Sequence, residues 1–393
     1  MSQRPIGRSA DLQRLRADGY TIALLGGLLV VRDIPYVDTT GTVHDDGILV
    51  MPLVLSGDTA QAPSDHTAHF VGGVPCDRDG APLDKIINNT DSQQLAEGLI
   101  ASCYFSAKPH GTGCYKDFHD KVTTYVAHIS SPAQALECDV TAQRHRPVPA
   151  ELDDGPFAYT DTASSRAGID VINDRVRDER IGIIGLGGTG VYTLDLIAKT
   201  RVAQIHPFDR DRFLTHNAFR APGAPTLAEL EELPFKVERF TAIYSNMHRG
   251  IIPHPYDIDA ANVDELRELT FVFICIDDNE AKKPIFAALE EYGIPFIDVG
   301  MGVDEVAGKL TGIIRTTTST PAKRSHIEAR VPAGTVIDDE YRTNIQIAEL
   351  NALNAALAVI RWKKERGIYA DLEREHHSLY AISGNHLTNL DQP

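Results

Sequence analysis

The segment RIGIIGLGGTG, residues 180–190, constrains the fold of this chain more than any other stretch. A β-branched run leads into four glycines, and an apolar segment of helical character follows; the glycines are Gly185, Gly187, Gly188 and Gly190. Glycines at a strand-to-helix turn let the backbone approach a phosphate closely and leave the helix N-terminus facing it. The segment therefore predicts a nucleotide-binding loop. Because it lacks the lysine that ends a P-loop, a dinucleotide for hydride transfer and ATP both remain open.

From residue 180 the chain alternates candidate strands with candidate helices. Strands are predicted at IGIIG, AQIHPFD, FVFICID and PFIDVG, and helices at VYTLDLIAK and EAKKPIFAALEEY. This alternation is typical of parallel strands joined by crossover helices, so we expect a doubly wound α/β sheet. A later helix, IQIAELNALNAALAVIRWKKERG, places four apolar residues on one face, which we expect to pack into the core: Leu350, Leu353, Leu357 and Ile360.

The first part of the chain has a different pattern. Prolines and acidic residues interrupt the apolar pattern at RHRPVPAELDDGP, residues 144–156, and we place a domain boundary there. We expect a smaller mixed α/β domain over residues 1–150 and a Rossmann-like nucleotide-binding domain over residues 157–393, which the polar residues discussed below make an ATP-binding domain. In the smaller domain, whose role is left open, the pattern predicts strands at 23–31 and 47–55 and helices at 92–100 and 116–129.

Charge and cysteine usage exclude several classes of function. A net charge of −17 disfavours broad contact with a phosphate backbone, so we expect no nucleic-acid partner. No stretch reaches the roughly 18 to 20 apolar residues of a spanning helix, and the N-terminus lacks the apolar region of a signal peptide. We therefore expect no membrane partner. The five cysteines, at 76, 103, 114, 138 and 275, form no C-x-x-C pair, which fits a reducing cytoplasm and argues against a zinc or disulfide framework.

Polar residues that follow the glycine loop favour ATP over a dinucleotide. An acidic residue about 20 positions beyond such a loop is expected to bind a ribose, and Asp209 in HPFDRD, followed by Asp211, supplies it. Asn217, Arg220 and Lys236 come next. A triphosphate needs cations and a metal ion, whereas a helix N-terminus largely satisfies the pyrophosphate of a dinucleotide.

The expected metal ligand is a carboxylate at the carboxyl end of a strand. Open α/β sheets bind ligands at that edge, and magnesium prefers oxygen donors. Asp277 and Asp278 follow the predicted strand FVFI and supply two such carboxylates. Either residue could instead cap the helix that follows.

Together these motifs resemble those of a known superfamily. The pattern G-x-G-G-x-G, then D-x-D with N and R, then a lysine and C-x-D before a helix, is similar to that of the E1-like adenylyltransferases. These are the ubiquitin-activating enzymes and the bacterial MoeB, ThiF and HesA proteins. The similarity covers roughly residues 160–365, so the chain resembles a bacterial member with an extra N-terminal domain. The resemblance implies ATP-dependent adenylation of the C-terminal carboxylate of a ubiquitin-like or sulfur-carrier protein, in a bacterial ubiquitin-like conjugation pathway.

The resemblance also implies a role for each matching residue. Asp209 would bind the ribose, Asp277 would bind magnesium, and the triphosphate would be contacted by Asn217, Arg220 and Lys236. Asp278 stands where the family usually has asparagine. Arg166 in SSRAGI matches an arginine that reaches into the partner subunit's site, so we expect a homodimer in which the catalytic groups are Arg166, Arg220, Lys236 and Asp277.

Two features of the family are missing from the sequence. Where relatives carry a zinc-binding P-C-x-x-C, this chain reads PAKRS at 321–325, so we expect no zinc. No cysteine follows Cys275, so a thioester within the adenylation domain is not expected, and an E2-like protein or a hydroxyl of the run RTTTSTPAKRS, residues 315–325, could accept the adenylate. Two rival hypotheses stay open: adenylation of a non-protein substrate such as a tRNA base, and a noncatalytic nucleotide-binding module.

Overall fold

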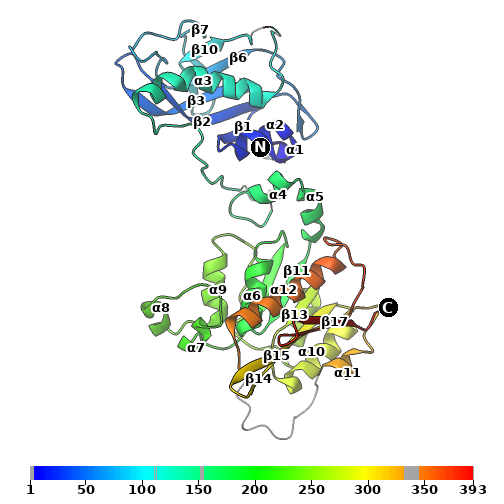
Figure 1. Ribbon diagram of the computed structural model, residues 1–393. Coiled ribbons are helices and arrows are strands. Elements are labelled where there is room, and N and C mark those ends of the chain that lie inside the picture. The colour runs from blue at the N-terminus through cyan, green and yellow to red at the C-terminus, as the bar shows by residue number, and fades with distance from the viewer. Residues whose placement is uncertain (1–3, 110, 112, 151–154, 332–344, 393) are drawn as a thin grey trace. The chain divides into compact units, whose positions relative to one another are not determined.

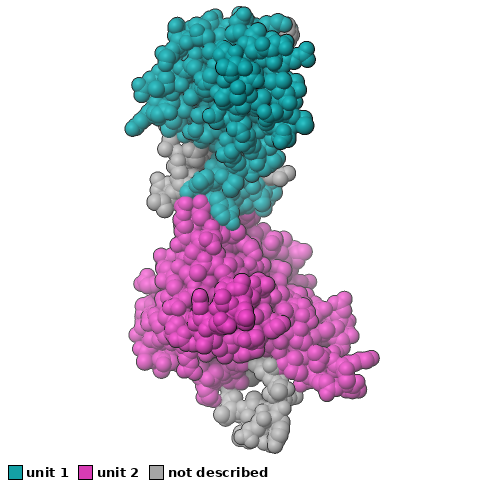
Figure 2. Space-filling view, turned by 90° about the vertical axis from the view of Figure 1, so that its left-hand side faces the viewer, with its two compact units in different colours: residues 1–154, 159–169 teal, residues 155–158, 170–393 magenta. Residues whose placement is uncertain are grey.

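The computed structural model describes residues 4–109, 111, 113–150, 155–331 and 345–392. The chain forms two compact units, shown in different colours in Figure 2. Unit 1 comprises residues 1–154 and 159–169, and unit 2 comprises residues 155–158 and 170–393. Each unit has its own sheet and core, and each is described by itself.

Unit 2 is built on a seven-stranded sheet with the order β12-β11-β13-β14-β15-β16-β17. The first four strands in this order are parallel: β12 (Gln204–Phe208), β11 (Arg180–Ile184), β13 (Phe271–Ile274) and β14 (Phe296–Val306). The last three add antiparallel: β15 (Lys309–Ser319), β16 (His377–Ala381) and β17 (His386–Leu390). The parallel part confirms the predicted α/β class.

Helices cover both faces of this sheet (Figure 1). Ile181 and Ile183 of β11 pack with one set of helices, whereas Ile184 packs with the other. The first set is α6 (Gly188–Ile197), α9 (Lys236–Tyr244) and α12 (Ala348–Glu365), and the second is α10 (Asn279–Glu291) and the 3-10 helix η3 (Val263–Glu268). Strands buried on both faces are apolar throughout, which explains the β-branched runs in the sequence. The doubly wound, Rossmann-like fold is confirmed.

Short helices fill the connections of unit 2. They are α5 (Asp170–Asn173), η2 (Asp174–Val176), α7 (Thr215–Ala218), α8 (Leu227–Glu231) and α11 (Ile327–Arg330). The α7 and α8 helices lie between β12 and α9, in the segment that follows Asp209. This segment carries several of the predicted site residues.

The predicted apolar face of α12 is wrong. Leu350 is buried, but Leu353 and Leu357 are only half-buried and Ile360 is 43% exposed. The buried face is shifted around the helix and consists of Asn351, Asn354, Ala355, Ala358, Val359, Arg361 and Trp362. Small alanines allow the close approach of α12 to α6, and hydrogen bonds satisfy part of each buried asparagine.

Within the described residues, no helix combines the length and apolar character needed to cross a bilayer.

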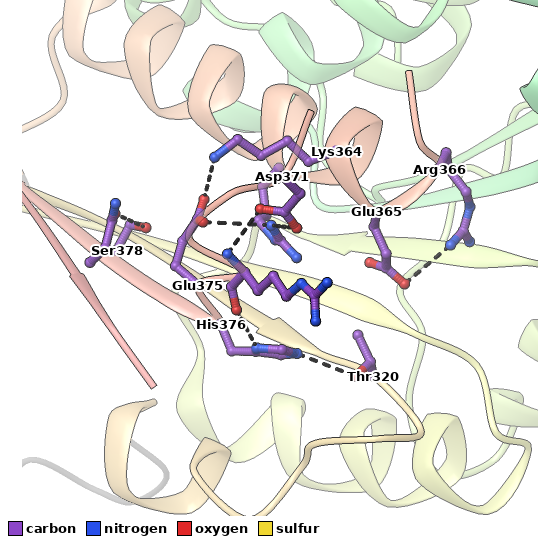
Figure 3. Close-up of polar contacts among 11 residues, drawn as sticks. Thr320, Lys364, Glu365, Arg366, Asp371, Glu375, His376 and Ser378 are labelled. Carbon is purple, nitrogen blue, oxygen red and sulfur yellow. Dashed lines mark hydrogen bonds and ion pairs between the residues drawn. The ribbon is translucent and has the colours of Figure 1, made fainter. Parts of the chain in front are cut away.

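A buried ionic network joins the C-terminal turn of α12 to the segment that enters β16 (Figure 3). Arg361 Nη1 lies 2.6 Å from Asp371 Oδ2, and Lys364 Nζ lies 2.8 Å from Glu375 Oε1. Glu375 is 5% exposed, and these two cations compensate its negative charge. The network ties the segment that leads into β16 to the end of α12.

Unit 1 has a six-stranded antiparallel sheet with the order β1-β2-β3-β6-β10-β7. Helices α2 and α3 pack on one face through Leu12, Leu15, Phe118 and Ile129. The strands are β1 (Thr21–Leu25), β2 (Leu28–Val37), β3 (Val43–Pro52), β4 (Leu55–Ser56), β5 (Thr59–Ala60), β6 (Thr67–Val71), β7 (Ile87–Asn89), β8 (Gln93–Ala96), β9 (Leu99–Ala101) and β10 (Cys103–Ser106). The helices are α1 (Arg4–Arg8), α2 (Ala10–Ala17), α3 (Phe118–Leu136) and α4 (Thr162–Ala167).

Two predicted elements of unit 1 are wrong. The expected strand at 23–31 is a hairpin, because Gly26 and Gly27 adopt φ of +58° and +83° and turn the chain between β1 and β2. The expected helix at 92–100 is the hairpin β8–β9, whose turn contains Gly98 at φ +72°. Leu95 and Leu99 of this hairpin pack on the second face of the sheet, so tertiary burial outweighs local helix propensity. The helix predicted at 116–129 is confirmed as α3.

We expect acid to destabilise unit 2 through its buried histidines. The His248 side chain is fully buried, its Nε2 lies 3.0 Å from the Val202 carbonyl, and its Nδ1 accepts from the Gly250 N–H. Burial lowers the pKa of His248 to about 4 from an ordinary 6.5. The unfolded chain therefore binds the proton first, and His248 alone should remove roughly 1 kcal/mol of stability by pH 5.5.

The measurement is urea unfolding at pH 7.5 and 5.5, followed by fluorescence of the only tryptophan. Trp362 is fully buried in unit 2 and reports on that unit. His206 and His377, whose pKa values burial also lowers to about 4, add to the loss of stability in the same direction. The His248→Gln variant should lose less stability on acidification than the unmodified protein. An equal loss would contradict this assignment.

Candidate active site

Three predicted site segments meet at one edge of the sheet of unit 2. The glycine loop follows β11, Asp209 follows β12, and Asp277 comes shortly after β13. These strands are parallel, and Ile184 of β11 is in register with Phe208 and with Ile274. Their carboxyl ends therefore lie side by side, at the edge where open α/β sheets bind ligands.

The glycine loop is packed tightly on all but one side. Gly185 turns the chain at φ +89°, and a Cβ there would lie 2.6 Å from Ile276. A Cβ at Gly190 would lie 1.9 Å from the Gly185 carbonyl oxygen, and one at Gly188 would lie 2.1 Å from Asn351 Nδ2. A Cβ at Gly187, the N-cap of α6, would meet nothing within 4 Å among the described residues. Only Gly187 therefore presents its Cα to open space.

This contrast predicts opposite outcomes for two alanine substitutions. Gly190→Ala should destabilise unit 2 by about 3 kcal/mol, because the clash is with backbone that cannot move aside. Gly187→Ala should leave stability within about 0.5 kcal/mol but weaken nucleotide binding, because the methyl group would occupy the face that a phosphate approaches. Unfolding curves and nucleotide titrations of both variants measure this. Stable Gly190→Ala protein would contradict the packing argument.

Asp209 fastens the glycine loop to the end of β12. It is 7% exposed, its Oδ2 accepts from the Leu186 N–H at 2.7 Å, and its Oδ1 accepts from the Asp211 N–H at 2.8 Å. Burial raises the pKa of Asp209, although Lys236 and the two backbone donors oppose the shift. The carboxylate is thus held in one orientation beside the loop, as a ribose ligand would need to be.

Lys236 joins both acidic residues of the HPFDRD segment. Its ammonium lies 2.7 Å from Asp211 Oδ2 and 3.4 Å from Asp209 Oδ2, and its backbone N–H donates to the Asp211 carbonyl. Lys236 is 5% exposed, whereas the Asp211 side chain is 62% exposed. The structure therefore brings these three predicted residues together.

Asn217 and Arg220 differ in how far their side chains are already engaged. Asn217 is buried, and its Oδ1 accepts from the Leu214 N–H at 2.8 Å, which caps α7. The Arg220 backbone N–H donates to the Asn217 carbonyl. Arg220 Nε is buried and has no hydrogen-bond partner among the described residues. A half-buried cation with a buried, unused donor fits an anionic ligand.

The two adjacent aspartates after β13 have different environments. Asp278 is the N-cap of α10, and its Oδ1 accepts from the backbone N–H groups of Glu280 and Ala281 at 2.9 and 3.1 Å. This is the capping role that the sequence left open for either residue. Asp277 precedes the cap and is exposed. Of the pair, Asp277 is the better candidate for a metal ligand.

Two buried asparagines that the sequence prediction missed connect α12 with α6 and with β14. Asn351 and Asn354 on α12 are each 1% exposed. The Thr189 hydroxyl donates to Asn351 Oδ1 at 2.9 Å, and Asn354 Nδ2 donates to the Gly300 carbonyl of β14 at 3.2 Å. Two amides three residues apart in an otherwise apolar helix were the available signal. Their spacing of three residues places both amides on the face of α12 that contacts α6 and β14.

Arg166 and the predicted hydroxyl segment lie on elements other than those described above, α4 and β15. Arg166 lies on α4 in unit 1, its side chain is outside the described part of the chain, and its role stays a prediction. The hydroxyl hypothesis loses support, because the hydroxyl residues of β15 from Thr316 to Ser319 are buried within the sheet. The histidine that follows this run, His326, is buried, and its Nε2 lies 3.0 Å from the Thr318 carbonyl oxygen.

The residues at this edge fit ATP and magnesium. Gly187 leaves room for a phosphate at the N-terminus of α6, and the unused Arg220 donor suits its charge. Magnesium is usually bound by one or two carboxylates together with substrate phosphates, and Asp277 supplies an exposed carboxylate. Among the described residues, no three His, Cys, Asp or Glu side chains form a group that could hold a metal ion.

Comparison with known protein families gives two matches that divide the chain. The profile of the ThiF family matches residues 162–360. The profile of a domain of unknown function, DUF6791, matches residues 10–162. The two matches meet at residue 162, close to the change between the two compact units.

Curated relatives and solved structures each match about half of the chain. Ubiquitin-like modifier-activating enzyme 5 of Drosophila grimshawi is 24% identical over 207 residues, which covers 49% of this chain and 51% of that protein. The Culex quinquefasciatus protein of the same name is 24% identical over 172 residues, covering 40% and 43%. The chain spans about half the length of the curated relatives it matches. The structure of Escherichia coli MccB solved with ATP aligns with a TM-score of 0.46 and 14% sequence identity, and covers 56% of this chain and 66% of MccB. The structure of PaaA aligns with a TM-score of 0.44 and 16% sequence identity, and covers 56% of this chain and 66% of PaaA.

Proposed function

This chain belongs to the ThiF family, and from that premise we propose that it is an ATP-dependent adenylyltransferase. The proposed substrate is the C-terminal carboxylate of a ubiquitin-like or sulfur-carrier protein. The observation that carries the proposal is the meeting of the glycine loop, Asp209, Lys236 and Asp277 at one strand edge. Relatives named as ubiquitin-like modifier-activating enzymes support the substrate class.

The reaction is an in-line displacement at the α-phosphorus of ATP. A carrier carboxylate oxygen forms a bond to this phosphorus, the bond to the bridging oxygen of the β-phosphate breaks, and pyrophosphate leaves with the electron pair. The product is an acyl-adenylate. Because the attacking carboxylate is already an anion, no general base is needed. The protein contributes positioning and charge neutralisation instead.

Each residue at the edge has one task in this scheme. Asp209 accepts hydrogen bonds from the ribose, and its buried position keeps the nucleotide beside the glycine loop. Arg220 and Lys236 neutralise the triphosphate, with Asn217 holding the turn that presents Arg220. Asp277 would hold magnesium, which supplies positive charge to the phosphates when bound.

The proposed assembly is a homodimer with a carrier protein and an E2-like acceptor as partners. In the family pattern, Arg166 would complete the site of the partner subunit. Apart from Arg166, the proposed site residues lie in unit 2, so we propose that the sheet domain of unit 1 recognises the carrier or the acceptor.

Isotope exchange between ATP and pyrophosphate tests the proposal. The carrier to supply is a ubiquitin-like or sulfur-carrier protein whose sequence ends in glycine, sought first among the proteins encoded beside this chain's gene. We expect exchange that requires magnesium and this carrier, and loss of exchange when the carrier's terminal glycine is removed. Exchange that proceeds equally without any carrier would refute adenylation of a protein carboxylate.

A further inference from the structure

One buried cation near the proposed triphosphate site has no role in the scheme above. Arg239 lies on α9, one helical turn after Lys236, and its side chain is 7% exposed. Its Nε and Nη1 have no hydrogen-bond partner among the described residues. Buried guanidinium groups are rarely left with unused donors, because each costs the desolvation of a charged group. The two unused donors of Arg239 would therefore suit an anionic ligand.

The protein itself compensates the charge of Arg239 incompletely. The nearest acid is Glu229, whose Oε1 lies 3.6 Å from Arg239 Nη2, beyond hydrogen-bond distance. Glu229 is already engaged in capping α8, since its Oε2 accepts from the N–H and the hydroxyl of Thr226. The guanidinium instead stacks on aromatic rings, 4.4 Å from the centre of Phe213 and 5.0 Å from that of Phe240. Stacking fixes the plane of the group and leaves its edges able to donate.

Backbone pairing places Arg239 beside the Asp211–Lys236 pair. The Phe213 N–H donates to the Pro234 carbonyl, and the Lys236 N–H donates to the Asp211 carbonyl. Residues two apart in extended backbone project to the same side, about 7 Å apart. The Asp211 carboxylate pairs with the Lys236 ammonium, and the Phe213 ring stacks on the Arg239 guanidinium. The two cations therefore lie next to each other on the same side of this segment.

We propose that Arg239 is a further phosphate-binding residue of this site, and that it binds the terminal phosphates of ATP. This inference rests on the proposed function. Arg220 with one unused donor and Arg239 with two would then act with Lys236, and together they would supply three positive charges to the β- and γ-phosphates. The leaving pyrophosphate carries these same phosphates, so Arg239 would also favour its departure.

The test compares binding of ATP and AMP to the full-length protein by calorimetry, with magnesium and without carrier. Arg239→Ala should weaken ATP binding about tenfold or more, because a charge-assisted hydrogen bond is lost, and should change AMP binding less than about twofold. Arg239→Lys should restore part of the ATP affinity. Arg212→Ala is the matched control: Arg212 also stacks on a ring, that of Phe235 at 4.5 Å, but it donates to the Leu233 carbonyl and is exposed.

The outcomes separate the inference from the proposed function. If the unmodified protein binds ATP and Arg239→Ala binds it equally well, Arg239 has no role in phosphate binding and the inference alone fails. Equal weakening of ATP and AMP binding would show a structural role, and would also overturn it. Absence of ATP binding in the unmodified protein would refute the proposed function and the inference together. Trp362 fluorescence verifies that each variant is folded. If the alanine variant is not folded, Arg239→Gln, a shorter polar side chain without the charge, replaces it.

Discussion

Replacing Asp277 by asparagine should lower the rate of ATP–pyrophosphate exchange by about two to three orders of magnitude. Asp277 is an exposed carboxylate at the edge where β11, β12 and β13 end, and unlike Asp278 it is not the N-cap of α10. An amide keeps the shape of the side chain but removes the charge that would hold magnesium beside the phosphates. The charge that develops on the departing pyrophosphate would then depend on the cationic side chains alone. Half-saturation by magnesium should move to higher concentration in the same assay.

The neighbouring residue provides a matched control. Asp278→Asn changes an identical side chain one position away, and asparagine is as good an N-cap as aspartate. Because Asp278 accepts the first backbone N–H groups of α10, its substitution should leave exchange within about threefold of the unmodified rate. If Asp278→Asn abolishes exchange and Asp277→Asn does not, the roles assigned to the two residues are reversed.

Much of unit 2 could be predicted from the sequence because its signals are local. A parallel strand buried on both faces is a short apolar run, and each such run here is followed by a glycine or an acid at the strand end. The glycine loop, Asp209 and Asp277 are read from their distance to these strands. The structure brings them to one edge, since parallel strands place all their carboxyl ends together.

What could not be predicted depends on tertiary contacts. The buried face of α12 is set by how closely alanines let it approach α6, and the predicted leucine stripe ends at the exposed Ile360. The hairpin β8–β9 has a sequence that suits a helix, and only its packing on the sheet of unit 1 explains its conformation. Apolar spacing carries no information on which neighbour a residue will meet.

The same limit applies within the site. The two amides of α12 are three residues apart, but this spacing does not say that Asn351 contacts the glycine loop, and Arg239 belongs to no recognised motif. Asn351 became visible because its amide fills the place of a Cβ on Gly188. Arg239 became visible because two of its donors are buried without an acceptor among the described residues. Asn351 is found from the space that it excludes, and Arg239 is found from its unsatisfied hydrogen-bond donors. A single sequence encodes neither property directly.

Mixing two inactive variants should restore activity if Arg166 acts in the partner subunit. Arg166→Ala and Asp209→Ala should each be inactive, because each removes a charged group from every site of its own homodimer. In a mixed dimer, the subunit carrying Arg166→Ala keeps its own Asp209 and receives an intact Arg166 from its partner. One of its two sites is then complete. Random exchange of subunits makes half of the dimers mixed, so exchange activity should return to about a quarter of the unmodified level.

A second mixture tests the direction of this contribution. Lys236→Ala and Asp209→Ala both remove residues of unit 2 that contact each other within one chain, 3.4 Å apart. Their mixed dimer has a defect in each site, so no activity should return. If Arg166 acted within its own subunit, the first mixture would behave in the same way as the second, because every site would again lack one group. Recovery in the first mixture but not in the second is therefore the result that a shared site requires, and inactivity of both mixtures after complete subunit exchange would place Arg166 in its own chain's site.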